Sequence, residues 1–239
     1  KNIAIGSNIN AAINFLLQVR KRLGSRFVFS FSVGLTHFSN GSMKSPNYGL
    51  NIPSISGGLA FRLAKENPYF KQKLLPELSP FYFDGKKSVD LDVSVAFGYK
   101  DMLAEIGGRY LVFAANANLM KPISFKTKYG AALDFSYDGT DEQLILMENG
   151  PGYLKNNAQL IQIGMGGVFE LNMSRVSLIG TLGIYIFTKY MGNGNIYEKL
   201  ALKYQFNQHW FSSITLKVHA GRADYITLGV GYKFMLIFY

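Results

Sequence analysis

The sequence has 239 residues, no Cys and a formal net charge of +10. The lack of Cys excludes disulfide scaffolds, thiolate metal sites and cysteine nucleophiles. No window reaches the roughly 18 uninterrupted apolar residues of a transmembrane helix, which argues against a helical membrane protein. The basic charge is compatible with nucleic acid, an anionic membrane surface or phosphorylated lipid, and its sign alone does not choose among them.

The composition favours a β-rich domain. Aromatic residues make up 15% of the chain and Gly contributes 25 residues, a balance that suits strands and tight turns. Because there is no internal repeat or low-complexity linker, we expect one domain that covers residues 1–239. The sequence starts at Lys1 without Met, and we expect that a leader, and more of the chain, precedes it.

Long strands with one apolar and one polar face recur along the chain. In residues 88–100, Val, Leu, Phe and Tyr alternate with Ser, Asp, Gly and Lys over about thirteen residues, whereas a strand in a soluble protein usually has about 5 to 6. A tilted transmembrane strand needs about 9 to 11 residues and a polar lumen face. We therefore predict eleven strands, at 8–19, 26–39, 50–64, 88–101, 107–120, 125–137, 158–171, 175–188, 197–206, 210–220 and 224–236.

The connections between these strands fit a barrel. Short turns at 20–25, 121–124, 172–174 and 207–209 are expected at one rim, and long loops at 138–157 and 189–196 at the other. The connection formed by residues 65–87 departs from this pattern, because it is long although it lies at the rim where short turns are expected. We expect a short surface helix in it. Since single-chain bacterial barrels have an even number of strands, we expect about 12, with at least one upstream.

These patterns predict an all-β fold, an antiparallel transmembrane β-barrel of the bacterial outer membrane. Aromatic residues toward strand ends fit interfacial girdles, and charged residues on the second face fit a hydrated lumen. The terminal aromatic pair Phe238-Tyr239 on an amphipathic last strand supports the same location.

One segment, residues 34–51, concentrates polar groups where a strand ends. His37 and Ser39 share the parity of the apolar residues before them, and Asn51 shares the parity of those after it, so all three are expected on the lipid face. Polar groups on that face are costly unless they have a purpose. A Ser beside a His that a third group orients is the general arrangement for acyl transfer.

The segment His37-Phe38-Ser39-Asn40-Gly41, with Pro46-Asn47 and a polar residue twelve positions after the Ser, resembles the lipid A 3-O-deacylase (PagL-like) and acyloxyacyl hydrolase family. The resemblance is specific over about residues 26 to 64. It implies an outer-membrane hydrolase in which His37 and Ser39 are catalytic and the site faces the membrane. The implied substrate is the lipid A of lipopolysaccharide, in a Gram-negative cell.

The third catalytic position departs from the family. It is typically Glu, and here it is Asn51, which still accepts a hydrogen bond from the imidazole but does not offset the imidazolium charge. Asn40, directly after the Ser, is a candidate oxyanion donor, and Lys44 and Asn47 are candidate substrate-binding residues.

The other histidines and glycine-rich runs have ordinary structural interpretations. We expect His209 in a turn and His219 facing the lumen, and Gly164–Gly167 and Gly192–Gly194 are not phosphate loops, because no helix start follows them. The first hypothesis is therefore a lipid A deacylase that uses no metal or cofactor and binds no nucleic acid. The alternatives are a catalytically silent barrel, which binds lipopolysaccharide or supports partner subunits of an outer-membrane complex, and a small diffusion pore.

Overall fold

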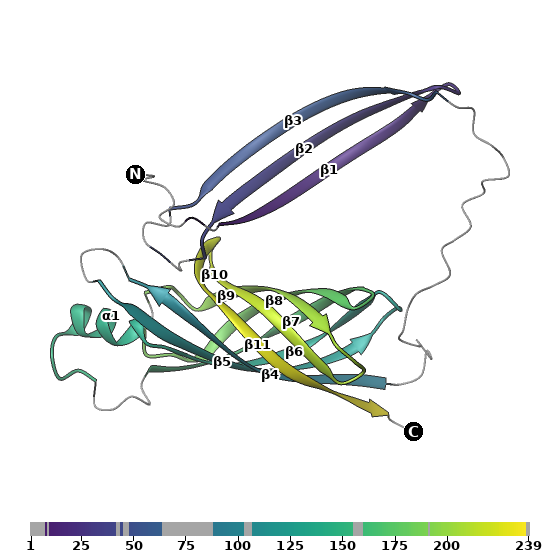
Figure 1. Cartoon of the computed structure of the whole chain (residues 1–239). Coiled ribbons are helices and arrows are strands. Elements are labelled where there is room, and N and C mark those ends of the chain that lie inside the picture. Colours follow the sequence, from purple (N-terminus) through teal and green to yellow (C-terminus); the bar gives the residue numbers. More distant parts are fainter. Residues whose placement is uncertain are drawn as a thin grey trace. The chain divides into compact units, whose positions relative to one another are not determined.

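A computed structural model describes residues 8, 10–41, 44, 48–63, 88–102, 107–154, 160–190 and 192–237. Within these ranges it contains eleven strands and one α-helix, so every predicted strand is present with ends that differ by a few residues (Figure 1). The elements are β1 Ala11–Leu23, β2 Phe27–Ser39, β3 Leu50–Phe61, β4 Ser88–Asp101, β5 Arg109–Pro122, β6 Thr127–Asp138, α1 Thr140–Asn149, β7 Ile161–Met173, β8 Val176–Phe187, β9 Ile196–Gln205, β10 Trp210–His219 and β11 Arg222–Ile237.

The chain divides into two compact units. The first comprises residues 1–40 and 46–78, and the second comprises 41–45 and 79–239. Within the first unit, β2 pairs antiparallel with β1 on one side and with β3 on the other, which gives a three-stranded sheet. The expectation of a single domain over residues 1–239 stays a prediction.

The second unit is a closed antiparallel barrel. Strands β4 to β10 each pair with the next strand in the chain, and β11 pairs with both β10 and β4, so the ring closes at eight strands. The predicted class, an all-β barrel, is confirmed. The predicted count of about 12 strands in one barrel is wrong, because β4 takes β11 as its edge partner. An alternating pattern identifies strands but does not say which distant strand closes the ring.

The barrel has an apolar outside and a polar inside. On β4 the outward side chains include Val93, Val95 and Phe97, all at least 39% exposed, whereas Asp92 and Ser94, which alternate with them, are buried. The same alternation runs through the other barrel strands. Because a soluble barrel has the opposite polarity, this distribution is typical of outer-membrane barrels.

Ion pairs fill much of the lumen. Lys203 Nζ lies 2.8 Å from Asp92 Oδ2 and 2.5 Å from Glu170 Oε1, and the side chains of all three residues are 1% exposed. A second lysine, Lys128, lies 2.9 Å from Asp90 Oδ2 and 3.5 Å from Glu170 Oε2. Burial of a charge is expensive unless an opposite charge compensates it. The polar residues of each strand therefore depend on partners from strands across the lumen.

The long connection after β6 contains an element that the sequence reading missed. Residues 138–157 were expected as a loop, and the structure places α1 in its first half. Asp138 Oδ1 accepts hydrogen bonds from the backbone N–H and the hydroxyl of Thr140, which fixes the start of the helix. In the part of the chain that the structure describes, no helix is long and apolar enough to cross a membrane. The helix expected in residues 65–87 lies outside the described residues.

The lumen ion pairs give a test of stability. We expect Lys203→Met to lower the free energy of unfolding by about 3 to 5 kcal/mol, because it leaves Asp92 buried without its paired cation and Glu170 with the more distant Lys128. Urea unfolding in lipid vesicles measures this change. Lys121→Met, at an exposed position near the end of β5, is the matched control. Equal stability of the two variants would show that the buried pairs contribute nothing specific.

Candidate active site

The candidate site lies at one end of the β2–β3 hairpin. The strand register places His37 directly opposite Asn51. The two side chains are joined by a hydrogen bond of 2.6 Å between His37 Nδ1 and Asn51 Oδ1. Because an amide oxygen only accepts hydrogen bonds, the imidazole donates through Nδ1–H. In the neutral ring, Nε2 then carries the lone pair, which is the state that a general base requires.

Ser39 shares its face of the sheet with His37. The two residues are two positions apart on β2, and side chains at that spacing point to the same side of a strand. Their partners on β1 are Ala11 and Ile13, which are two positions apart as well. Ser39 is only 5% exposed, so its hydroxyl lies in a sheltered setting at the strand end. The sheet therefore brings a hydroxyl, an imidazole and an amide to one edge of one face.

That face of the sheet is otherwise apolar except for Lys21, near the turn between β1 and β2. Its exposed side chains are Phe15, Leu17, Val19 and Leu23 on β1, Phe27, Phe29, Phe31, Val33 and Leu35 on β2, and Ile55, Leu59 and Phe61 on β3. The opposite face carries small polar groups, among them Ser32 and Ser56, whose hydroxyls are 2.7 Å apart. The site is therefore a polar group at the edge of a large apolar surface.

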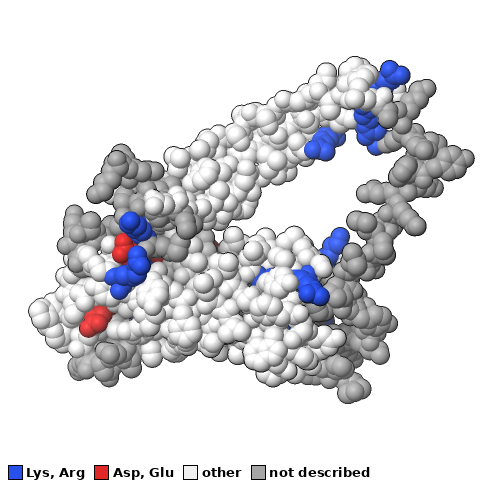
Figure 2. All heavy atoms as spheres, viewed as in Figure 1, with Lys and Arg blue, Asp and Glu red and all other residues white. Residues whose placement is uncertain are grey.

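The other end of the sheet is basic and aromatic. Figure 2 shows Lys and Arg side chains gathered at the end of the sheet where β1 turns into β2. The rings of Phe27 and Phe61 pack there with centroids 5.2 Å apart, and the guanidinium of Arg26 lies 5.9 Å from the centre of the Phe61 ring. A band of aromatic residues followed by basic residues is typical of a membrane interface.

The remaining candidate residues have different positions. Asn40 follows Ser39 directly and is fully buried. Lys44 is exposed and lies in residues 41–45, which group with the second unit. Asn47 lies outside the described residues. The roles of these three residues in oxyanion or substrate binding stay predictions.

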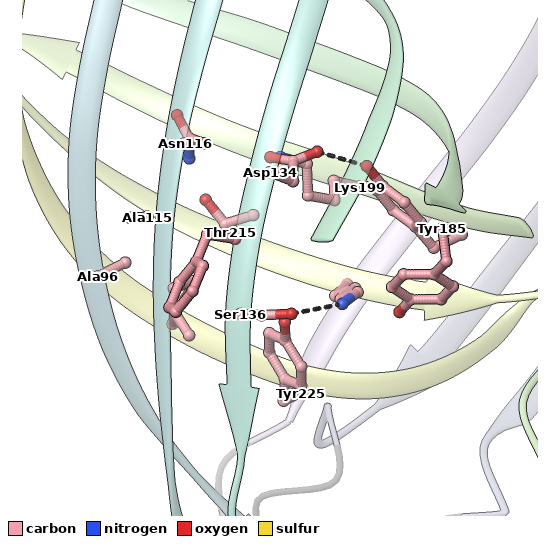
Figure 3. Close-up of a pocket in the computed structure, with 15 residues that line it drawn as sticks. Ala96, Ala115, Asn116, Asp134, Ser136, Tyr185, Lys199, Thr215 and Tyr225 are labelled. Carbon is pink, nitrogen blue, oxygen red and sulfur yellow. Dashed lines mark hydrogen bonds and ion pairs between the residues drawn. The ribbon is translucent and has the colours of Figure 1, made fainter. Parts of the chain in front are cut away.

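A group of polar side chains in the barrel lumen surrounds a cavity of about 20 Å³ (Figure 3). Asp134 accepts a hydrogen bond of 2.6 Å from the hydroxyl of Tyr197 and pairs with Lys199. The ammonium of Lys217 donates to Ser136 Oγ at 3.2 Å. A cavity of this size holds about one water molecule. It has no room for an acyl chain, and side chains that pack this closely argue against a diffusion pore.

The two other histidines occupy the settings expected for them. His219 is 6% exposed in the lumen, and its Nε2 lies 2.8 Å from the hydroxyl of Tyr185. His209 lies in the turn before β10, where its Nδ1 is 3.0 Å from the carbonyl oxygen of Lys233. Neither histidine has a Ser two positions away along the chain, so neither repeats the spacing of His37 and Ser39.

One ionisable group at the barrel rim was not found by the sequence reading. Asp141 in the first turn of α1 is 2% exposed, and burial, followed by the charge of Asp138, raises the pKa of its carboxyl to about 8. Gln162 donates a hydrogen bond of 2.7 Å to Asp141 Oδ2, which ties α1 to β7. Among the described residues, no group of three or more His, Asp and Glu side chains is arranged to hold a metal ion.

The fold and the site together define a class of protein. A barrel with an apolar outer surface, and a Ser, a His and an Asn at the edge of an apolar sheet face, are features of an outer-membrane hydrolase whose substrate is a lipid. A family model described as "Acyloxyacyl hydrolase, C-terminal domain" matches residues 89–236, and one described as "Lipid A 3-O-deacylase (PagL)" matches residues 1–60. Because the first match covers more than half of the chain, this protein belongs to the acyloxyacyl hydrolase family, and the family resemblance seen in the sequence is confirmed.

The two other comparisons add little. The search of curated proteins found no match. Among solved structures, the chain is similar to one titled "KdgM porin", with 8% sequence identity, a TM-score of 0.23, and an alignment that covers 96% of this chain and 97% of that chain. At this TM-score the likeness carries no argument about fold or function.

The hydrogen bond between His37 and Asn51 gives a second prediction. We expect Asn51→Asp to raise the turnover number on an acyl ester between about 10-fold and 10⁴-fold, because a carboxylate of the same size keeps the hydrogen bond and offsets the imidazolium charge. Asn51→Leu removes the acceptor and is expected to lower the turnover number by about 10² or more. Steady-state kinetics of the three purified proteins measures both effects. Equal rates for the Asp and Leu variants would contradict a contact between residue 51 and a working base.

Proposed function

We propose that this protein removes an ester-linked acyl chain from lipid A, with Ser39 as the nucleophile, His37 as the general base and Asn51 as the residue that orients the imidazole. The family supplies the coarser statement, an outer-membrane lipid A deacylase. The observation that carries the proposed mechanism is the 2.6 Å hydrogen bond between His37 Nδ1 and Asn51 Oδ1, on the face that Ser39 shares.

The proposed reaction has two halves. In the first, Ser39 Oγ attacks the ester carbonyl carbon, and its proton passes to His37 Nε2. The tetrahedral intermediate collapses when His37 gives that proton to the departing sugar oxygen, which leaves an acyl ester on Ser39. In the second half, water loses a proton to His37 Nε2 and attacks this ester, and the same proton returns to Ser39 Oγ as the fatty acid leaves. Asn51 keeps Nδ1 protonated throughout.

The neighbouring polar residues have proposed roles in substrate binding. Asn40 follows the nucleophile, and a donor that stabilises the developing oxyanion is worth about 3 to 4 kcal/mol where this has been tested. Lys44 and Asn47 lie in the same connection between β2 and β3, and they are proposed to contact the polar part of the substrate. An ammonium group pairs well with a phosphate oxygen.

The apolar face supports an approach of the substrate from within the membrane. From Phe27 to Ser39 the strand rises by about 3.3 Å per residue, or about 40 Å in all. At a tilt of about 45° this length spans the roughly 30 Å hydrocarbon core of a bilayer. The site then lies at the headgroup level, and the acyl chains of lipopolysaccharide in an outer membrane would reach Ser39 from the side.

A second candidate function rests on the identity of residue 51. An amide does not offset the charge that develops on His37, and in the serine-protease case an Asp→Asn change in the triad lowers the turnover number about 10⁴-fold. This departure favours the alternative, a silent barrel that binds lipopolysaccharide or supports partner subunits of an outer-membrane complex. Such a protein would keep the apolar face and lose only the chemistry.

Mass spectrometry of lipid A tests the first proposal. We expect cells that express the intact protein to lose one acyl chain from lipid A, and cells that express Ser39→Ala or His37→Ala to keep it, because either change removes a group that moves the proton. Ser54→Ala, at an exposed position on the opposite face of β3, and His209→Gln are the matched controls.

The outcome separates the two candidate functions. Loss of the acyl chain in cells with the parent protein and with both controls, but not with the Ser39 and His37 variants, is the result that a Ser/His hydrolase requires. If lipid A is unchanged while heat-modifiable electrophoresis shows folded protein in the outer membrane, the deacylase proposal fails and the silent barrel is favoured.

A further inference from the structure

Gly49 lies against the catalytic imidazole. It comes directly before β3, and its φ angle is +72°, in the left-handed region that favours glycine. A Cβ atom added to Gly49 would lie 3.1 Å from His37 Cε1, 3.8 Å from His37 Nε2 and 3.4 Å from the carbonyl oxygen of Phe38. The first of these distances is closer than ordinary van der Waals contact, so a side chain at position 49 would require the imidazole to move.

The imidazole of His37 is therefore held from two sides. Asn51 binds it at Nδ1, and the backbone of Gly49 lies beside the edge formed by Cε1 and Nε2. That second edge carries the nitrogen that exchanges protons with the Ser hydroxyl and with the departing alcohol in the proposed mechanism. Any group that fills the space of a Cβ at position 49 would press on Cε1 and require the ring to shift by a few tenths of an ångström against its bond to Asn51.

We propose that Gly49 is a positioning residue, whose missing side chain keeps the Cε1–Nε2 edge of His37 open and fixes the ring against Asn51. This proposal rests on the proposed function for its catalytic consequence and deepens it. Gly49 touches neither the ester nor the nucleophile in this role. It acts through His37. A displacement of about 1 Å in such a group lowers a rate about 10²-fold, so the few tenths of an ångström imposed by a Cβ at position 49 correspond to a severalfold loss.

The chain offers a control for backbone strain. Gly24, in the turn between β1 and β2, has a φ angle of +70°, and a Cβ added there would meet nothing within 4 Å. Gly24→Ala therefore introduces the same backbone strain as Gly49→Ala without a contact to His37. Gly49→Asn separates the effect of the Cβ from the effect of backbone strain in a second way. Asn tolerates a positive φ better than Ala does, but it still carries a Cβ.

The experiment combines kinetics with a spectroscopic readout on the full-length protein. We expect Gly49→Ala and Gly49→Asn to lower kcat for lipid A severalfold with little change in KM, and Gly24→Ala to leave both unchanged. In protein labelled with ¹³C at histidine Cε1, the chain's three histidines give three signals, and His37→Ala assigns the one from His37. We expect both Gly49 variants to shift this signal and Gly24→Ala not to shift it.

Two results would overturn the proposal. One is an unmoved His37 signal in folded Gly49→Ala, which would mean that residue 49 does not contact the ring. The other is a variant series in which Gly49→Asn keeps the parent kcat while Gly49→Ala loses it, which would trace the loss to backbone strain. A failure of the proposed function is distinguishable, because an inactive parent protein still reports the contact through the His37 signal.

Discussion

The barrel depends on one constraint. Because its exterior is apolar, every polar group in its interior needs a partner inside the protein. The outward side chains exclude water from the lipid side of the barrel. The backbone groups and the inward polar residues therefore need hydrogen-bond and charge partners from other strands. Closure between β11 and β4 removes the free sheet edges, and ion pairs such as Lys203 with Asp92 connect strands across the lumen. The same pairs that stabilise the ring also fill it, which is why a barrel of eight strands with this interior is a poor pore.

The candidate site follows from the same alternation. An antiparallel hairpin sets residues of equal parity opposite one another, so the parity that puts His37 outward puts Asn51 beside it. The proposed catalytic group lies on the apolar face of the three-stranded sheet and not in the lumen of the closed barrel. The apolar side chains along β1, β2 and β3 suit the acyl chains of a lipid, whereas each of two cavities in the lumen of the closed barrel holds about one water molecule.

Strand positions and side-chain parity were readable from the sequence because both are local, with a period of two residues. Ring closure was not, since nothing local links β4 with β11 more than a hundred residues later. Helix α1 was missed because it is short, weakly amphipathic and set inside a loop. The pairing of His37 with Asn51 was expected from parity, but the contact with Gly49 depends on a positive φ angle that no alternation pattern reveals.

The identity of residue 51 determines what kind of catalyst this site makes. A factor of about 10⁴ in rate corresponds to about 5.5 kcal/mol of transition-state stabilisation, and in a serine protease an amide at the third position loses about that much. The amide still fixes the tautomer of His37, and the donors near Ser39 act independently of it. In the proposed function, a lower turnover number is therefore the expected consequence of this amide, because its bond to Nδ1 positions the ring without offsetting the charge that develops on it.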